Sequence, residues 1–137
     1  MKQLILRGAI GGAVGGIIWL MMVSGFQAAS EGIGMLSLII IGYLLLVLPT
    51  TTVIGAATGL LVKLIHIKSN KNIGVVARAT IGIVAATSAM VLFLYKQGDI
   101  SNGNFSWITL TFILTFGIIV GSLTGVIIGD QRKIELK

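Results

Sequence analysis

The chain has 137 residues, of which 55% are hydrophobic and 10% are charged, and its mean hydropathy is +1.05. A soluble domain carries about 25% charged residues, so this chain has too few polar groups to coat a water-soluble globule. The absence of cysteine excludes disulfides, thiolate metal sites and a cysteine nucleophile. The net charge of +6 could indicate nucleic-acid binding, but the basic residues lie at the ends of apolar stretches. We therefore interpret the charge as membrane topology and expect no nucleic-acid partner.

Four long stretches, residues 8–30, 32–62, 79–95 and 100–129, contain no Asp, Glu, Lys or Arg. Crossing a bilayer core of ~30 Å takes about 20 helical residues, and three of these stretches are longer than that. The third becomes long enough if it begins near Ile73 and includes Arg78. Transmembrane strands would need about ten residues of alternating polarity, and no such alternation occurs. The sequence therefore predicts an all-α membrane protein of one domain, residues 1–137, with transmembrane helices at about Leu4–Val23, Leu36–Ile65, Ile73–Tyr95 and Trp107–Gly129.

The first expected helix resembles a signal peptide, because Lys2 and Arg7 precede its apolar run and Ala28-Ala29-Ser30 follows it. The run is longer than the hydrophobic region of an ordinary signal peptide, so we expect a retained transmembrane helix. The chain then crosses the membrane four times, which places both termini on the same side.

The second expected helix contains the only proline of the chain, Pro49. Proline removes one backbone donor and its ring clashes with the carbonyl four residues back, here that of Leu45. The sequence therefore predicts a kink near the middle of this helix. Thr50, Thr51 and Thr52 follow directly, and their hydroxyls can bond the freed carbonyls. The segment is interpreted either as a kinked packing helix or as a break that lines a substrate path.

The third and fourth expected helices repeat features of the first two, which suggests two helix hairpins in tandem. Arg7-Gly8-Ala9-Ile10-Gly11 and Arg78-Ala79-Thr80-Ile81-Gly82 place Arg, Ile and Gly at identical spacing near the start of the first and third helices. Residues 55–60 and 121–126 share a Gly-x-x-x-Gly pattern in the second and fourth. Because each half crosses twice, the two hairpins would form a parallel repeat about an axis along the membrane normal. Chance remains the alternative, since small and branched residues dominate the chain.

Glycines at spacings of four residues predict close helix contacts. Lipid tails are as apolar as leucine, so helices in a membrane associate through close packing and hydrogen bonds, and glycine lets a neighbouring backbone approach. The partner of each face could be another helix of this chain, a second copy of it, or a foreign protein. The glycines expected at such contacts are Gly8, Gly12, Gly16, Gly55, Gly59, Gly117, Gly121, Gly125 and Gly129.

The distribution of Lys and Arg predicts the orientation. Only Lys96 falls on the side opposite the termini. This positive-inside bias predicts cytoplasmic termini in a multi-pass protein of a bacterial inner membrane or a thylakoid membrane. The nine basic residues on the terminal side are Lys2, Arg7, Lys63, Lys68, Lys71, Arg78, Arg132, Lys133 and Lys137.

Arg7 and Arg78 are the polar residues nearest to the apolar spans, each about one turn inside its helix. They are expected to serve as topology anchors, and one of them can pair with Asp130 at the end of the fourth helix or with an anionic lipid headgroup. We favour Arg78, because the third and fourth helices are joined by a short loop. Trp19, Trp107 and Tyr95 are expected to lie near the outer interface as an aromatic belt.

The sequence offers no catalytic residues, no cofactor site and no metal site. No acidic residue lies within an apolar span, and the lone histidine, His66, lacks partners for a metal and is expected to be a solvated interfacial side chain. We expect a non-enzymatic structural or accessory subunit of a larger membrane complex, in contact with the lipid bilayer and with other subunits or itself. The alternative is a small homo-oligomeric channel or transporter. Its support is the possible repeat, the predicted break at Pro49 and a set of hydroxyl residues: Thr58, Thr80, Thr87, Ser88, Thr115, Ser122 and Thr124.

Overall fold

The computed structural model describes residues 2–32, 34, 36–98 and 106–129, which form four helices and no strand. Each helix is long and apolar enough to cross a membrane, so the prediction of an all-α chain with four such helices is confirmed. The helices are α1 (Lys2–Glu31), α2 (Leu36–Ser69), α3 (Val75–Lys96) and α4 (Trp107–Ile128).

The helices end where local backbone geometry stops them. α1 continues past Val23 because no proline interrupts it, and it ends before Gly32, whose φ of +92° is left-handed. α2 ends before Asn70, the only described non-glycine residue with positive φ. α4 stops at Ile128 because Gly129 adopts a φ of +74° and its backbone N–H bonds the carbonyl of Val126.

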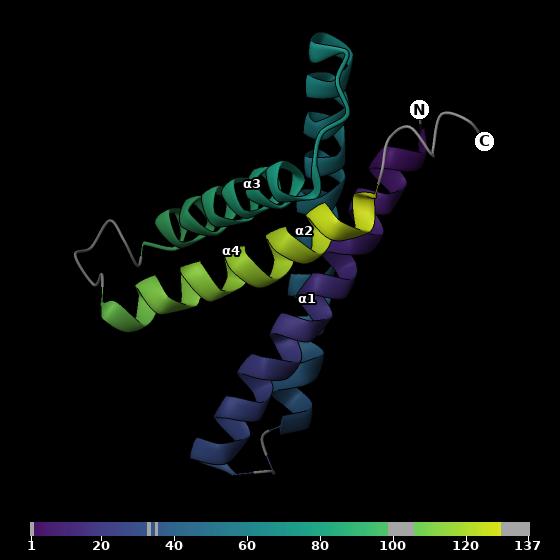
Figure 1. The fold of residues 1–137 in the computed structure, drawn as a ribbon. Coiled ribbons are helices and arrows are strands. Elements are labelled where there is room, and N and C mark those ends of the chain that lie inside the picture. The colour runs from purple at the N-terminus through teal and green to yellow at the C-terminus, as the bar shows by residue number, and fades with distance from the viewer. Residues whose placement is uncertain (1, 33, 35, 99–105, 130–137) are drawn as a thin grey trace.

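The helices form two antiparallel hairpins that cross obliquely (Figure 1). α1 and α2 make the first hairpin, and α3 and α4 make the second. Besides the contacts within the hairpins, the most extensive contact joins α1 to α4, whereas α2 touches α3 and α4 much less. The helices therefore pack in the order α2, α1, α4, α3, and the side between α2 and α3 stays comparatively open.

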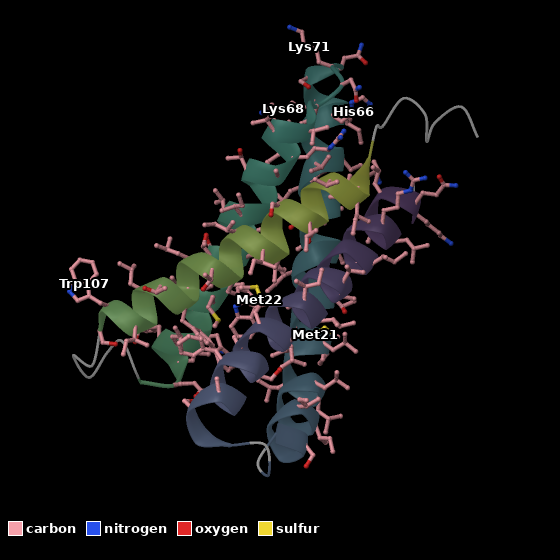
Figure 2. All side chains as sticks on the ribbon, turned by 60° about the horizontal axis from the view of Figure 1, so that its bottom comes forward. Met21, Met22, His66, Lys68, Lys71 and Trp107 are labelled. Atoms are coloured by element: carbon pink, nitrogen blue, oxygen red, sulfur yellow. The ribbon has the colours of Figure 1, made fainter. Side chains whose placement is uncertain are left out.

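We call the terminal end the part that carries the start of α1, the connection Asn70–Gly74 and the end of α4. We call the loop end the part that carries the two hairpin tips, at Gly32 and at Gln97, which diverge from each other in Figure 1. α2 has 34 residues and is about 51 Å long, which exceeds a ~30 Å bilayer core. Figure 2 shows His66, Lys68 and Lys71 grouped at its projecting end, and Trp107 at the far end of α4.

The core consists of two clusters along the α1–α4 contact. The larger one lies toward the loop end and contains a buried tryptophan, Trp19, packed against α4 and reached by α2 and α3. The smaller one lies at the terminal end, where Leu4, Val62, Ile73 and Ile128 meet. All four helices therefore contribute to one packed unit.

Candidate functional site: the open side between α2 and α3

The contact between α1 and α2 is a backbone-to-backbone approach at glycine. A Cβ atom added to Gly12 would lie 3.0 Å from the Cα of Gly55, and one added to Gly59 would lie 3.1 Å from the Cα of Ile5. Gly8 and Gly55 face each other directly, each within contact of the other's carbonyl group. No side chain larger than hydrogen fits at these positions without separating the helices.

The contact between α3 and α4 is built in the same way. A Cβ on Gly82 would lie 2.9 Å from the carbonyl carbon of Gly121, and one on Gly125 would lie 2.5 Å from the Cα of Ala79. Gly117 instead faces the side chain of Thr87. The Gly-x-x-x-Gly segments of α2 and α4 thus occupy corresponding places in the two hairpins.

The hairpins join through a second face of α1. A Cβ on Gly11 would lie 2.8 Å from the Cα of Thr124, and one on Gly15 would lie 2.8 Å from the Cα of Val120. This contact departs from a strict two-fold repeat: Gly11 packs on α4 in the other hairpin, whereas Gly82, its counterpart in the sequence pattern, packs on α4 in its own hairpin.

Toward the loop end, the α1–α4 contact is aromatic. The ring of Trp19 lies edge-on to Phe112 at a centroid distance of 4.7 Å and to Phe116 at 5.0 Å. Trp19 is only 2% exposed, so the expectation that it belongs to an interfacial belt was wrong. Gly15, one turn before Trp19 on α1, lets α4 approach closely enough to cover the indole ring. Tyr95 and Trp107 are exposed at the loop end, and Trp107 is 84% exposed.

Gly129 has a different role from the other eight glycines expected at helix contacts. It terminates α4, and a Cβ there would lie 3.0 Å from a terminal guanidinium nitrogen, Nη1, of Arg7. The Arg7 guanidinium therefore lies beside the negative end of the α4 dipole, where a cation is stabilising.

Arg78 is buried, with 4% of its surface exposed, and its Nη1 donates to the carbonyl oxygen of Ile73 at 2.9 Å. The side chain therefore folds back over the connection that precedes α3, and its backbone packs against Gly125. Asp130 lies outside the described residues, so its pairing with Arg78 stays a prediction.

Around Pro49, α2 runs as one continuous helix from Leu36 to Ser69. The hydroxyls of Thr50, Thr51 and Thr52 donate to the carbonyls four residues back, at 2.6, 2.8 and 2.6 Å. None of the three bonds the carbonyl of Leu45, which the proline leaves without its helical donor, so that part of the prediction is not borne out. The helix is nevertheless not interrupted at Pro49, and a bend in its axis at this residue stays a prediction.

Most of the hydroxyls that could mark a polar path donate to carbonyls of their own helix. Buried Thr58 bonds the carbonyl of Ile54 at 2.9 Å, and buried Thr124 bonds that of Val120 at 2.6 Å. Because these bonds consume the hydroxyl protons, the hydroxyls are left mainly as acceptors. The same bond to a carbonyl four residues back is made by Thr80, Thr87, Thr115 and Ser122.

A cavity of about 290 Å³ lies toward the loop end of the open side. Trp19 forms its wall from α1, Thr50 and Thr51 from α2, and Phe112 and Phe116 from α4. The wall from α3 and its C-cap residue contains Ala89, Met90, Phe93, Leu94 and Gln97. Exposed Leu46 is among its lining residues, so the cavity is open at the surface and hydrocarbon from outside can cover its apolar walls.

A second, shallower hollow lies on the same open side, between Leu61 of α2 and one face of α3. We call it the α3 hollow. Its α3 residues are Ala77, Thr80, Ile81, Val84, Ala85 and Ser88, which are mostly small. Its surface bears no charged side chain among the lining residues, so it suits contact with lipid or with another apolar helix.

The described residues contain no group of three His, Asp or Glu side chains that could hold a metal ion. His66 is partly buried rather than fully solvated, and its Nδ1 lies 2.8 Å from the carbonyl oxygen of Lys71. This hydrogen bond therefore stabilises the connection between α2 and α3. Comparisons with protein-family models, with curated proteins and with solved structures found no match to this chain.

Proposed function

We propose that the chain is a non-enzymatic accessory subunit that packs against another membrane protein through the α3 hollow. The main support is that three of the four helix–helix boundaries around the bundle are closely packed and the fourth is not. Glycine contacts close the boundaries α2–α1, α1–α4 and α4–α3, and the boundary between α2 and α3 is left open. We further propose a bacterial inner or thylakoid membrane, with both termini cytoplasmic, on the distribution of Lys and Arg.

The glycine faces themselves do not supply the partner surface. Gly8, Gly12, Gly55 and Gly59 are occupied between α1 and α2, and the glycines of α4 are occupied by α3. One surface that remains is the exposed face of α3, where small residues recur at three- and four-residue spacing. Ala77, Thr80 and Ser88 are exposed there and would let a foreign helix approach closely.

A site-specific crosslink tests this proposal. A photoreactive phenylalanine analogue placed at Val84, in the α3 hollow, should give one crosslinked product of defined mass in the source cells. Ile118 of α4 is the matched control, because the two side chains are 58% and 54% exposed. The two positions also lie at similar heights along the bundle, because Gly82 and Gly121, two and three residues away from them, are in contact. Equal crosslinking at both positions, or none at Val84, would contradict the proposal.

Native mass measurement after gentle detergent extraction separates the two classes of function. A complex with a foreign protein that Ala85→Phe dissociates supports the accessory subunit. A complex whose mass is a multiple of the chain supports the alternative, a homo-oligomeric channel or transporter. That alternative rests on the cavity beside Thr50 and Thr51, but the cavity lining carries no charge and the hydroxyl protons are already bonded.

A further inference from the structure

The cavity at the loop end is suited to a hydrocarbon. Its walls are mainly aromatic and aliphatic, and the hydroxyl protons of Thr50 and Thr51 are bonded to the carbonyls of Leu46 and Val47. A polar ligand would therefore find few donors inside, and water has too few partners to be held there. The occupant must be apolar over most of its length.

The bilayer supplies such an occupant directly. The cavity is lined by residues of all four helices, each of which is long and apolar enough to span a membrane. Leu46 lines the cavity and is also exposed, so the cavity opens to the surface there, and Leu45 beside it is exposed as well. Hydrocarbon from the membrane therefore reaches the opening without crossing a polar barrier.

The cavity lining extends along α3, in the direction that an acyl chain inserted beside this helix would take. Its α3 wall runs from Ala89 to Gln97, a rise of about 12 Å along the helix axis. Trp19 and Ile54 lie at the inner part of the lining, and Gln97 lies at the loop end, where α3 stops. A chain inserted between the hairpins would leave its polar head at Gln97.

The residue next to Gln97 supplies a charge for that head. Lys96 is exposed, and it is the only Lys or Arg between Arg78 and Arg132 in the sequence. No Lys or Arg occurs between Arg7 and Lys63 either, so the other hairpin brings none to this end. Within residues 89–98, which include the wall from α3, Lys96 is the only charged side chain, and Asp99 lies outside the described residues. A head at Gln97 would therefore be next to a cation, which favours an anionic lipid.

We propose that this cavity binds one acyl chain of an anionic phospholipid, whose headgroup lies at Lys96 and Gln97. Binding of the chain fills the space between the two hairpins where they are not closed by glycine. The lysine attracts the phosphate, and the attraction of one lysine for an anionic lipid surface corresponds to about a five-fold preference over a zwitterionic lipid.

Trp19 is a built-in reporter for this site. The chain has two tryptophans, and the other, Trp107, is exposed at the loop end and can be removed as Trp107→Phe. That variant is reconstituted in vesicles of phosphatidylglycerol or phosphatidylcholine whose acyl chains carry bromine, a contact quencher of indole. We expect loss of Trp19 emission although the ring is buried, with about a five-fold lower concentration of the anionic lipid needed. Unchanged emission in both brominated lipids would overturn the proposal.

Blocking variants identify the cavity as the place of contact. In the Trp107→Phe background, Ala89→Phe should restore the emission by filling the cavity, whereas Ala77→Phe on the same helix lies in the α3 hollow and should not. Thr50→Phe fills the cavity from α2 and is the substitute blocking variant if Ala89→Phe does not fold. Lys96→Gln should abolish the preference for phosphatidylglycerol. Equal quenching by both lipids in the Lys96-containing chain would overturn the assignment of an anionic headgroup.

Discussion

At the scale of single residues, the effect of a glycine depends on what its missing side chain would meet. A Cβ on Gly125 would lie 2.5 Å from a backbone atom of Ala79, whereas one on Gly25 or Gly42 would meet nothing within 4 Å. The spacing pattern in the sequence identifies the first kind as packing candidates. It cannot say which helix each glycine faces, because Gly11 and Gly12 are adjacent in the chain and face α4 and α2 respectively.

Replacing a contact glycine by leucine should therefore destabilise the fold. We expect Gly121→Leu and Gly125→Leu each to lower the free energy of unfolding by about 3 kcal/mol or more, because backbone rather than a flexible side chain must move. The measurement is loss of helical circular dichroism on titration with a denaturing detergent. Gly25→Leu is the matched control and should be neutral or stabilising, by up to about 1 kcal/mol, since glycine disfavours helix. Wild-type stability in both α4 variants would show that this contact does not form.

The two arginines should differ in their contribution to stability. Arg78→Ala removes a buried guanidinium that bonds the carbonyl of Ile73, and hydrogen bonds to charged groups contribute about 1.5–3 kcal/mol. Arg7→Ala removes an exposed guanidinium beside the end of α4, where the dipole contributes about 0.3–1 kcal/mol. Detergent denaturation of both variants measures the difference. Double-mutant cycles with Asp130→Asn then show which arginine couples to Asp130. A larger loss for Arg7→Ala would reverse the two roles.

At the scale of the helices, hydropathy alone predicted the number and approximate positions of the four elements. It could not predict that α1 continues to Glu31, because Ser24 and Gly25 lower the apolar signal without stopping a helix. The burial of Trp19 also could not be predicted from the sequence. An aromatic near the end of an apolar span is as compatible with the lipid interface as with a neighbouring helix, and the choice depends on whether α4 packs on that face.

The predicted bend at Pro49 can be measured within α2. Spin labels attached at Ile41→Cys and Leu64→Cys, both exposed positions in this cysteine-free chain, report the distance across the proline. A straight helix places these backbone positions about 35 Å apart. We expect a shorter distance in the wild-type background and about 35 Å after Pro49→Ala, because alanine restores the missing backbone donor. Identical distances in the two backgrounds would contradict the kink.

At the scale of the whole molecule, the tandem repeat indicated two similar hairpins but not how they are joined. Gly55 and Gly121 occupy corresponding places within their hairpins, and Thr58 and Thr124 are both buried. The junction is nevertheless asymmetric, since α1 packs closely on α4 through Gly11 and Gly15, whereas α2 and α3 contact each other much less. Small residues occur on every helix, so composition could not select this junction, nor the cavity and hollow that it leaves.

The most direct test is labelling of single cysteines from one side of the membrane, because four crossings place the two ends of the bundle on opposite sides. Gly34→Cys and Ser106→Cys lie at the loop end, and Asn70→Cys lies at the terminal end; all three positions are exposed. In intact bacterial cells that express these variants, an impermeant maleimide should label the first two and reach Asn70→Cys only after permeabilisation. Labelling of Gly34→Cys and Asn70→Cys from the same side would contradict the membrane-spanning arrangement itself.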